Sequence, residues 1–374
     1  MGHSLGAVER SLTLDGHLRA VPRRLMSRQS VLGHRLVAGG MLLFGTACLD
    51  PSSPSQPPSQ ADGNRCPSPG VGVSIGGDLG SQDDVVASPT RRLVLMGGGA
   101  EDDAAATLFA EGAGGGDLVI LRASGSLSSY PTYFTTSLTP QPRPSSAVTL
   151  LTAIPGTASD PAVLCWINRA EAVWLAGGSQ WDYLGRWPDT VHAALSQLSG
   201  RGAAVGGTSA GAMSLGEAAF DAQFGGVSSA EALSDPLRSD VSLSYPRFAQ
   251  PELDGTLVDS HFTERSREGR LLTFLARFLT ERGLASVVGV GLDEGVALVI
   301  DQGRYSVSTT GGGSAWIYQV KEPVVLAAGA PLDLTGVRFV RLANGSDGLW
   351  PIDFEAVAVE ELSVEQGVVR RGAS

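Results

Sequence analysis

Between about residues 91 and 205, short, continuous apolar runs alternate with amphipathic segments. Strands buried on both faces of a parallel sheet have such unbroken apolar runs. The expected strands are 93–96, 118–121, 145–151, 172–175 and 203–205. Helical periodicity and capping residues predict helices at 101–111, 161–169 and 189–198. This alternation predicts an α/β fold with a mostly parallel sheet sandwiched by helices.

The pattern changes in the second half of the chain. Residues 216–256 are expected to form a loop-rich insertion, and an arginine-studded amphipathic helix is expected to end near Arg282. Residues 287–292 are then expected to form a strand that ends at Asp293-Glu294. Short apolar runs predict added C-terminal antiparallel strands at 296–300, 305–307 and 315–320, and further β structure at 337–341. The pattern of the last thirty or so residues predicts no element.

The N-terminal part divides into a leader at 1–48 and a Pro/Ser-rich tether at 49–90, which we expect to be disordered. Positive residues precede an apolar stretch at 36–47 that is short for a bilayer span. Thr46-Ala47-Cys48 resembles a bacterial lipobox, although Gly45 stands where leucine is usual. The alternative is an ordinary cleavable signal. Both interpretations predict export, as a periplasmic or cell-surface lipoprotein or as a secreted protein.

The folded part is expected to be a domain at 91–345, followed by an extension at 346–374 of uncertain structure. The net charge of −11 argues against nucleic acid as a partner. Three cysteines without a C-x-x-C pair argue against a thiolate zinc site. With Cys48 assigned to the leader, Cys66 and Cys165 either form a disulfide or leave a buried free thiol.

A glycine-rich turn follows the apolar run at 203–205. Gly207, Ser209 and Gly211 fit G-x-S-x-G, the strand-to-helix elbow that projects a serine hydroxyl. Small neighbours are needed because the backbone of an elbow is crowded. The alternative is a tight turn of purely structural character. We interpret Ser209 as a nucleophile.

A serine nucleophile needs a base and a group that orients the base. His261 follows a predicted strand end, whereas His192 lies within a predicted helix, so His261 is the expected base. The third member is open between the carboxylates Asp259, Asp293 and Glu294. An α/β-hydrolase order would instead require an acid between serine and histidine. That acid would be one of Asp235, Asp240 and Asp254.

Five spaced motifs together resemble the cyanophycinase branch of the dipeptidase E family of serine peptidases, over roughly residues 91–345. These are Gly97-Gly98-Gly99, Ala176-Gly177-Gly178-Ser179-Gln180, Gly206-Gly207-Thr208-Ser209-Ala210-Gly211-Ala212, Asp259-Ser260-His261-Phe262 with Arg265, Arg267 and Arg270, and Leu292-Asp293-Glu294.

The resemblance implies a class I glutamine amidotransferase-like fold and a catalytic series of Ser209, His261 and Glu294. It also implies an oxyanion hole from the backbone of Ala210 and Gly178. The substrate contacts that it implies are Asp259, Ser260, Arg265, Arg267, Arg270 and Gln180. The family substrate is a poly-aspartate backbone with arginine side chains, cut into β-aspartyl-arginine dipeptides. Ser260 stands where cyanophycinases carry glutamine, which puts that substrate in question.

The sequence therefore predicts an exported serine-type exopeptidase of cyanophycinase type that needs no metal or organic cofactor. Its expected partner is a peptide or polyaspartyl-arginine substrate, with a lipid anchor through Cys48, and homodimerisation is left open. The alternatives are an α/β-hydrolase-type esterase and a non-catalytic surface lipoprotein that binds peptides.

Overall fold

The structure is a computed structural model that describes residues 65–80, 82–151 and 155–372. The predicted leader with Cys48 and the first part of the predicted tether lie outside the described residues. In the part that is described, no helix combines the length and the apolar character that crossing a membrane requires.

Among the described residues, nine strands form a central sheet whose middle is a parallel block, β4-β3-β5-β6-β2, with antiparallel strands on both sides. In spatial order the strands are β1 (Ser74–Asp78), β4 (Ser146–Leu151), β3 (Asp117–Arg122), β5 (Ala172–Leu175), β6 (Ala204–Thr208), β2 (Arg92–Met96), β11 (Val296–Asp301), β12 (Arg304–Thr309) and β15 (Asp347–Leu349).

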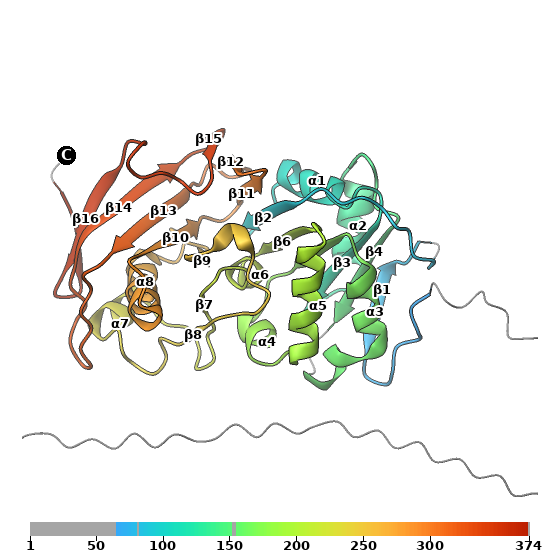
Figure 1. Ribbon diagram of the computed structural model, residues 1–374, viewed down its shortest axis with the longest axis horizontal. Coiled ribbons are helices and arrows are strands. Elements are labelled where there is room, and N and C mark those ends of the chain that lie inside the picture. The colour runs from blue at the N-terminus through green and yellow to red at the C-terminus, as the bar shows by residue number, and fades with distance from the viewer. Residues whose placement is uncertain (1–64, 81, 152–154, 373–374) are drawn as a thin grey trace, which may run out of the picture. The chain divides into compact units, whose positions relative to one another are not determined.

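Helices cover both faces of this sheet (Figure 1). On β2, Leu93 and Leu95 pack into one core cluster, and Val94 and Met96 pack into another on the opposite face. The unbroken apolar run of the strand follows from this two-sided burial. The helical segments of this half are α1 (Asp103–Glu111), α2 (Ser129–Thr132), a π-helical turn (Tyr133–Ser137), a 3₁₀ segment (Pro155–Ser159), α3 (Pro161–Arg169), α4 (Gln180–Leu184), α5 (Asp189–Gly200) and α6 (Ala210–Met213).

A second, mixed sheet follows in the C-terminal half and packs against α8 (Glu268–Arg282) (Figure 1). Its strands in order are β17 (Val368–Arg371), β16 (Glu360–Glu365), β14 (Leu334–Leu342), β13 (Ala315–Lys321), β10 (Ser286–Leu292) and β9 (Thr256–Ser260). The insertion before β9 contains β7 (Ala219–Phe220), α7 (Ser229–Ser234), β8 (Leu243–Ser244) and a 3₁₀ segment (Pro251–Leu253). The fold is thus α/β, with a mixed central sheet and an extra C-terminal sheet.

Two expected boundaries differ from the structure. Residues 65–80 and 82–90 fall in the predicted disordered tether, yet β1 pairs along its length with β4, and Cys66 forms a disulfide with Cys165 of α3. This segment has few apolar side chains and is ordered by backbone hydrogen bonds to a sheet edge and by a disulfide. Composition reveals neither of these interactions. The extension at 346–372 likewise contributes β15, β16 and β17 to the two sheets.

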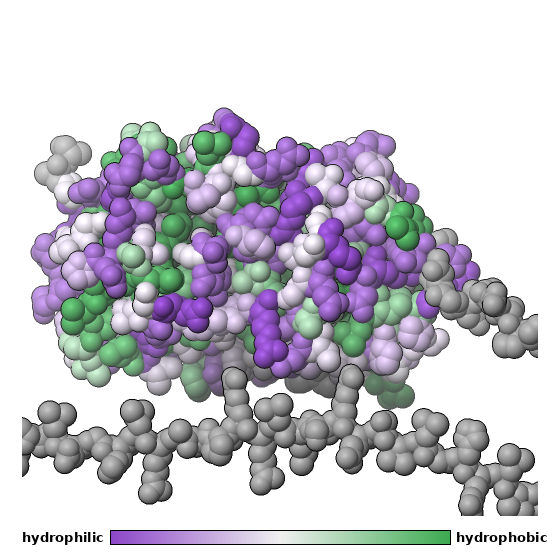
Figure 2. All heavy atoms as spheres, in the orientation of Figure 1, coloured by the Kyte–Doolittle hydropathy of each residue, from purple (hydrophilic) through white to green (hydrophobic). Residues whose placement is uncertain are grey.

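In the view of Figure 2, polar residues cover most of the described surface, and apolar residues appear in small separate groups.

Candidate active site

Ser209 lies in a strained turn between β6 and α6. Its backbone has φ 52° and ψ −121°, a conformation that non-glycine residues rarely adopt. The neighbouring glycines allow the turn to close. A Cβ on Gly211 would lie 2.0 Å from the carbonyl oxygen of Leu175, and one on Gly207 would lie 2.8 Å from the backbone of Gly211. The turn therefore has the geometry of a nucleophile elbow.

His261 follows the end of β9 and also has a positive φ, of 47°. Its N–H donates to the carbonyl oxygen of Gly97 at 2.8 Å, which joins this turn to the end of β2. The ring nitrogen Nε2 lies 2.8 Å from Ser209 Oγ. The structure therefore brings together the predicted nucleophile and the predicted base.

Glu294 lies beside His261 because β9 and β10 are parallel, with Ser260 opposite Leu292. Both strands end at the same level, so the residues that follow them meet. Glu294 Oε1 lies 2.5 Å from His261 Nδ1. Of the three carboxylates that the sequence left open, Glu294 is therefore the one that contacts the His261 ring, and the three side chains follow in the chain order serine, histidine, acid.

Asp293 supports this arrangement from inside the protein. It is buried, and its carboxylate accepts hydrogen bonds from the N–H of Thr263 (3.0 Å), the N–H of Ser314 (2.9 Å) and the indole of Trp316 (3.2 Å). Glu264 accepts a hydrogen bond from the N–H of Glu294 at 3.2 Å. Both carboxylates therefore fix the backbone on each side of the His261–Glu294 contact, a role that their sequence context does not reveal.

The glycine run after β2 packs directly on the histidine and the glutamate. A Cβ on Gly98 would lie 2.4 Å from His261 Cε1, and one on Gly99 would lie 3.0 Å from Glu294 Cβ. A Cβ on Gly97 would lie 2.0 Å from the carbonyl oxygen of Asp293. Glycine is needed at these positions because the backbone after β2 lies too close to His261 and Glu294 for a Cβ. The signal in the sequence is three glycines at a strand end.

Burial lowers the pKa of His261 below its ordinary value, and the nearby positive charges of Arg265 and Arg267 lower it further. The hydrogen bond and charge of Glu294 act in the opposite direction. The net effect favours a neutral ring at neutral pH. Nδ1 then carries the proton toward Glu294, and Nε2 is free to accept a proton from Ser209.

The turn between Gly177 and Gly178 lies next to Ser209. A Cβ on Gly177 would lie 3.4 Å from Ser209 Cβ and 3.9 Å from its Oγ. Ala210 is the first residue of α6, directly after the elbow. The two segments predicted to form the oxyanion hole therefore both adjoin Ser209, one in space and one along the chain.

The predicted arginine series does not face one surface. The Asp259 side chain is 0% exposed and holds Arg270 through two hydrogen bonds of 2.6 and 2.8 Å, and the Arg270 side chain is 5% exposed. Arg267 bonds to Asp259 Oδ1 (3.2 Å) and to the carbonyl oxygen of Ser260 (2.6 Å). Burial lowers the pKa of Arg267 to about 10. Asp259, Arg267 and Arg270 thus form an internal ion-pair cluster, and Arg265 is exposed.

Two other predicted substrate contacts are also buried. The Ser260 side chain is fully enclosed, and the amide of Gln180 donates to the carbonyl oxygen of Phe220 at 3.1 Å. His192, the histidine set aside in favour of His261, is buried with Nε2 3.0 Å from the carbonyl oxygen of Tyr183. Of the predicted contacts, Arg265 is the charged side chain that solvent reaches most freely.

A buried acid near the elbow had no signal in the sequence. Glu101 Oε1 accepts a hydrogen bond from the hydroxyl of Tyr130 at 2.5 Å. Burial raises the pKa of Glu101, although the hydrogen bond from Tyr130 opposes the shift. Glu101 Oε2 and the hydroxyl of Thr208, the residue before Ser209, are both buried without a hydrogen-bond partner in the part of the chain that the structure describes.

Within the described residues, no group of three or more histidine, cysteine, aspartate or glutamate side chains is arranged to hold a metal ion.

Comparison with known proteins finds no protein-family model and no curated protein that match the chain. Among solved structures, the chain is similar to a peptidase from an acI-B1 Actinobacterium, with a TM-score of 0.45 and 16% sequence identity. That match covers 71% of this chain and 98% of the other. A likeness this distant assigns no activity to the chain, so the function is argued from the site.

Proposed function

We propose that the protein is a serine hydrolase of the peptidase type, with Ser209 as nucleophile, His261 as general base and Glu294 as the group that orients the imidazole. The observation that supports this most directly is the continuous hydrogen-bonded series from Ser209 Oγ through both ring nitrogens of His261 to Glu294 Oε1. The strained backbone at Ser209 and His261 is typical of such sites.

In this mechanism Ser209 Oγ attacks the carbonyl carbon of the scissile bond, and its proton moves to His261 Nε2. Glu294 stabilises the imidazolium that forms. Backbone N–H groups of Ala210 and Gly178 would donate to the developing oxyanion, each contributing about 3 kcal/mol. The C–N bond then breaks as Nε2 returns the proton to the leaving amine. Water hydrolyses the acyl-enzyme by the same steps in reverse order.

For the substrate we propose a peptide or β-aspartyl-arginine polymer, as in cyanophycinases with their amidotransferase-like fold. Two features of the site support the assignment to a cyanophycinase-like hydrolase. One is the chain order serine, histidine, acid, and the other is the glycine run 97–99 packed on His261 and Glu294. Arg265 is exposed, so among the arginines of the series it is the one that we expect to bind a substrate carboxylate. Ser260 is buried in place of the family glutamine, so we expect this protein to prefer other β-aspartyl or α-aspartyl peptides over cyanophycin.

We also propose that the protein is exported and anchored through Cys48. The Cys66–Cys165 disulfide supports export, because disulfides persist in oxidising compartments.

The test compares purified wild type with Ser209→Ala on cyanophycin and on panels of β-aspartyl and α-aspartyl dipeptides. We expect Ser209→Ala to lower kcat by more than about 10⁴-fold, because no other group replaces the nucleophile. Thermal unfolding of both proteins serves as the folding control. Labelling of wild type, but not of Ser209→Ala, by a fluorophosphonate would identify the serine. Equal hydrolysis by the two proteins would refute the assignment.

A further inference from the structure

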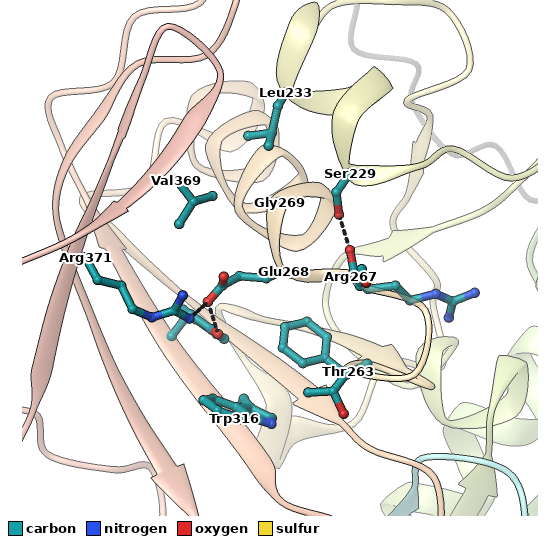
Figure 3. Close-up of a pocket in the computed structure, with 12 residues that line it drawn as sticks. Ser229, Leu233, Thr263, Arg267, Glu268, Gly269, Trp316, Val369 and Arg371 are labelled. Atoms are coloured by element: carbon teal, nitrogen blue, oxygen red, sulfur yellow. Dashed lines mark hydrogen bonds and ion pairs between the residues drawn. The ribbon is translucent and has the colours of Figure 1, made fainter.

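A cavity of about 330 Å³ lies between the start of α8, strand β13 and the C-terminal strand β17 (Figure 3). Its size is at the low end for small-molecule sites, which suits one side chain or a small ligand. Two of its lining residues, Val369 and Arg371, come from the end of the described chain, outside the segment whose motifs resemble a known family. The residues that the argument uses are Phe262, Glu268, Trp316, Tyr318 and Arg371.

The cavity already contains one guanidinium, that of the chain's own Arg371. Glu268 Oε1 accepts a hydrogen bond from Arg371 Nη2 at 2.6 Å (Figure 3). It accepts another from the hydroxyl of Tyr318 at 2.7 Å. In the described residues, no donor is bonded to the second oxygen, Oε2. The Glu268 carboxylate therefore has room for a further donor.

The two members of this ion pair differ in how firmly they are held. The Glu268 side chain is 23% exposed and belongs to the first turn of a 15-residue helix, where the helix dipole favours a negative charge. The Arg371 side chain is 50% exposed and belongs to an edge strand of four residues. An ion pair this exposed is weak. The Arg371 guanidinium also lies 5.5 Å from the centroid of the Phe339 ring, so a competing group has to replace this contact as well as the ion pair. Glu268 is the more buried and more firmly held charge of the two.

The rest of the wall also favours a cation. Phe262, Trp316 and Tyr318 form an aromatic group, with Phe262 5.9 Å from Tyr318 and 6.5 Å from Trp316 between ring centroids. Aromatic faces attract guanidinium groups. Arg267 lines the cavity, but its guanidinium is bonded to Asp259 and the carbonyl oxygen of Ser260, and it points away from Glu268 in Figure 3.

We propose that this cavity is a binding site for a guanidinium group, which binds Glu268 and displaces Arg371. Arg371 then acts as an internal competitor that occupies the site in the free protein. The site is separate from Ser209, His261 and Glu294, although Phe262 and Thr263 of its wall directly follow His261. The proposal is independent of hydrolysis, because it concerns binding alone.

The test is calorimetric titration of the full chain carrying Ser209→Ala with Nα-acetyl-L-argininamide. The matched neutral probe is Nα-acetyl-L-citrullinamide, which has the same shape without the charge. We expect the citrulline probe to bind at least about tenfold more weakly, and Glu268→Gln to weaken binding of the arginine probe by a similar factor. Arg371→Gln should strengthen it several-fold, because the competitor is removed. Arg370→Gln, on the same strand but outside the cavity, should leave it unchanged.

Equal binding of the two probes, or undiminished binding to Glu268→Gln, would overturn the proposal. Weaker binding to Arg371→Gln would also overturn it, because the site would then recognise the ligand through Arg371 itself. If Glu268→Gln does not fold, the Arg371→Gln result decides.

A second experiment, on the active protein, identifies the source of the guanidinium. A KM for arginine-containing peptides that rises in Glu268→Gln at unchanged kcat indicates a substrate side chain, and unchanged constants indicate a free ligand.

Discussion

At the scale of single residues, the site depends on backbone conformations that are costly elsewhere. Ser209 and His261 both have positive φ, and each is held by a main-chain hydrogen bond to the end of β2, from Ser209 N–H to Met96 and from His261 N–H to Gly97. Hydrogen bonds of this kind keep the two side chains in contact. The glycines that surround them have no Cβ to separate the histidine from the serine.

Gly98→Ala should lower hydrolytic activity by about 10²-fold or more, because its Cβ would overlap the His261 ring and move Nε2 away from Ser209. The measurement is kcat/KM on the best peptide substrate. Gly312→Ala is the matched control, since Gly312 has a similar φ of 84° with no atom within 4 Å of a new Cβ. Equal losses in both variants would show that backbone strain alone, and not the histidine, is responsible.

The pH dependence of activity should reflect His261. In the proposed mechanism the neutral ring is the base, so kcat/KM should fall as pH drops through the pKa of His261, at a pH below its ordinary value of 6.5. Arg265 lowers this pKa, so Arg265→Gln should raise it and move the acid limb to higher pH. Arg304→Gln, at an exposed position in β12, should leave the limb in place. A limb that moves to lower pH in Arg265→Gln would contradict this account.

At the scale of elements, parallel pairing of β9 and β10 brings His261 to Glu294, and α8 brings Arg270 to Asp259. The segment 259–270 thus supplies His261 to the candidate site and Arg270 to the interior. Its arginines are either buried or exposed, and their spacing in the sequence does not predict which.

Arg270→Gln should lower the free energy of unfolding by about 3–5 kcal/mol, because Asp259 would be left buried without its main partner. Arg265→Gln should change it by less than about 0.5 kcal/mol, as is usual for exposed positions. Urea unfolding of both variants tests the difference. Similar stabilities for the two variants would mean that the buried pair contributes little to the fold.

At the scale of the whole molecule, the first described residues, from Arg65 on, are joined to the central sheet. The Cys66–Cys165 disulfide spans 99 residues, and β1 extends the edge of the sheet beside β4. At the other end of the chain, β15 pairs with β12, while β16 and β17 complete the second sheet. The described segments at both ends, residues 65–80 and 82–90 and residues 346–372, are therefore part of the folded unit.

Replacing both cysteines, Cys66→Ser with Cys165→Ser, should lower the free energy of unfolding by about 2–5 kcal/mol, because a long loop in the unfolded chain is no longer closed. Thermal or urea unfolding measures the loss. Treatment of wild type with a reductant should produce a similar loss and should not affect the double variant. A double variant as stable as oxidised wild type would contradict the prediction.

The sequence by itself determined the elements with a strong local pattern. The buried strands, the helices between them and the turn at Ser209 follow from apolar runs, capping residues and glycines, all of which act over a few neighbouring residues. The contact between Ser209 and His261 was expected by elimination, because few other histidines were suitably placed.

Only the tertiary structure decided which distant groups meet. It placed Glu294, and not Asp259 or Asp293, against the His261 ring, turned Arg267 and Arg270 toward a buried carboxylate, and paired Cys66 with Cys165. It also placed β1 at one end of the folded unit, and β15, β16 and β17 at the other, in the two sheets, and it enclosed the cavity around Glu268. The physical reason is that local pattern fixes which face of an element is buried, whereas the partner of a charge, a thiol or a strand edge depends on long-range packing.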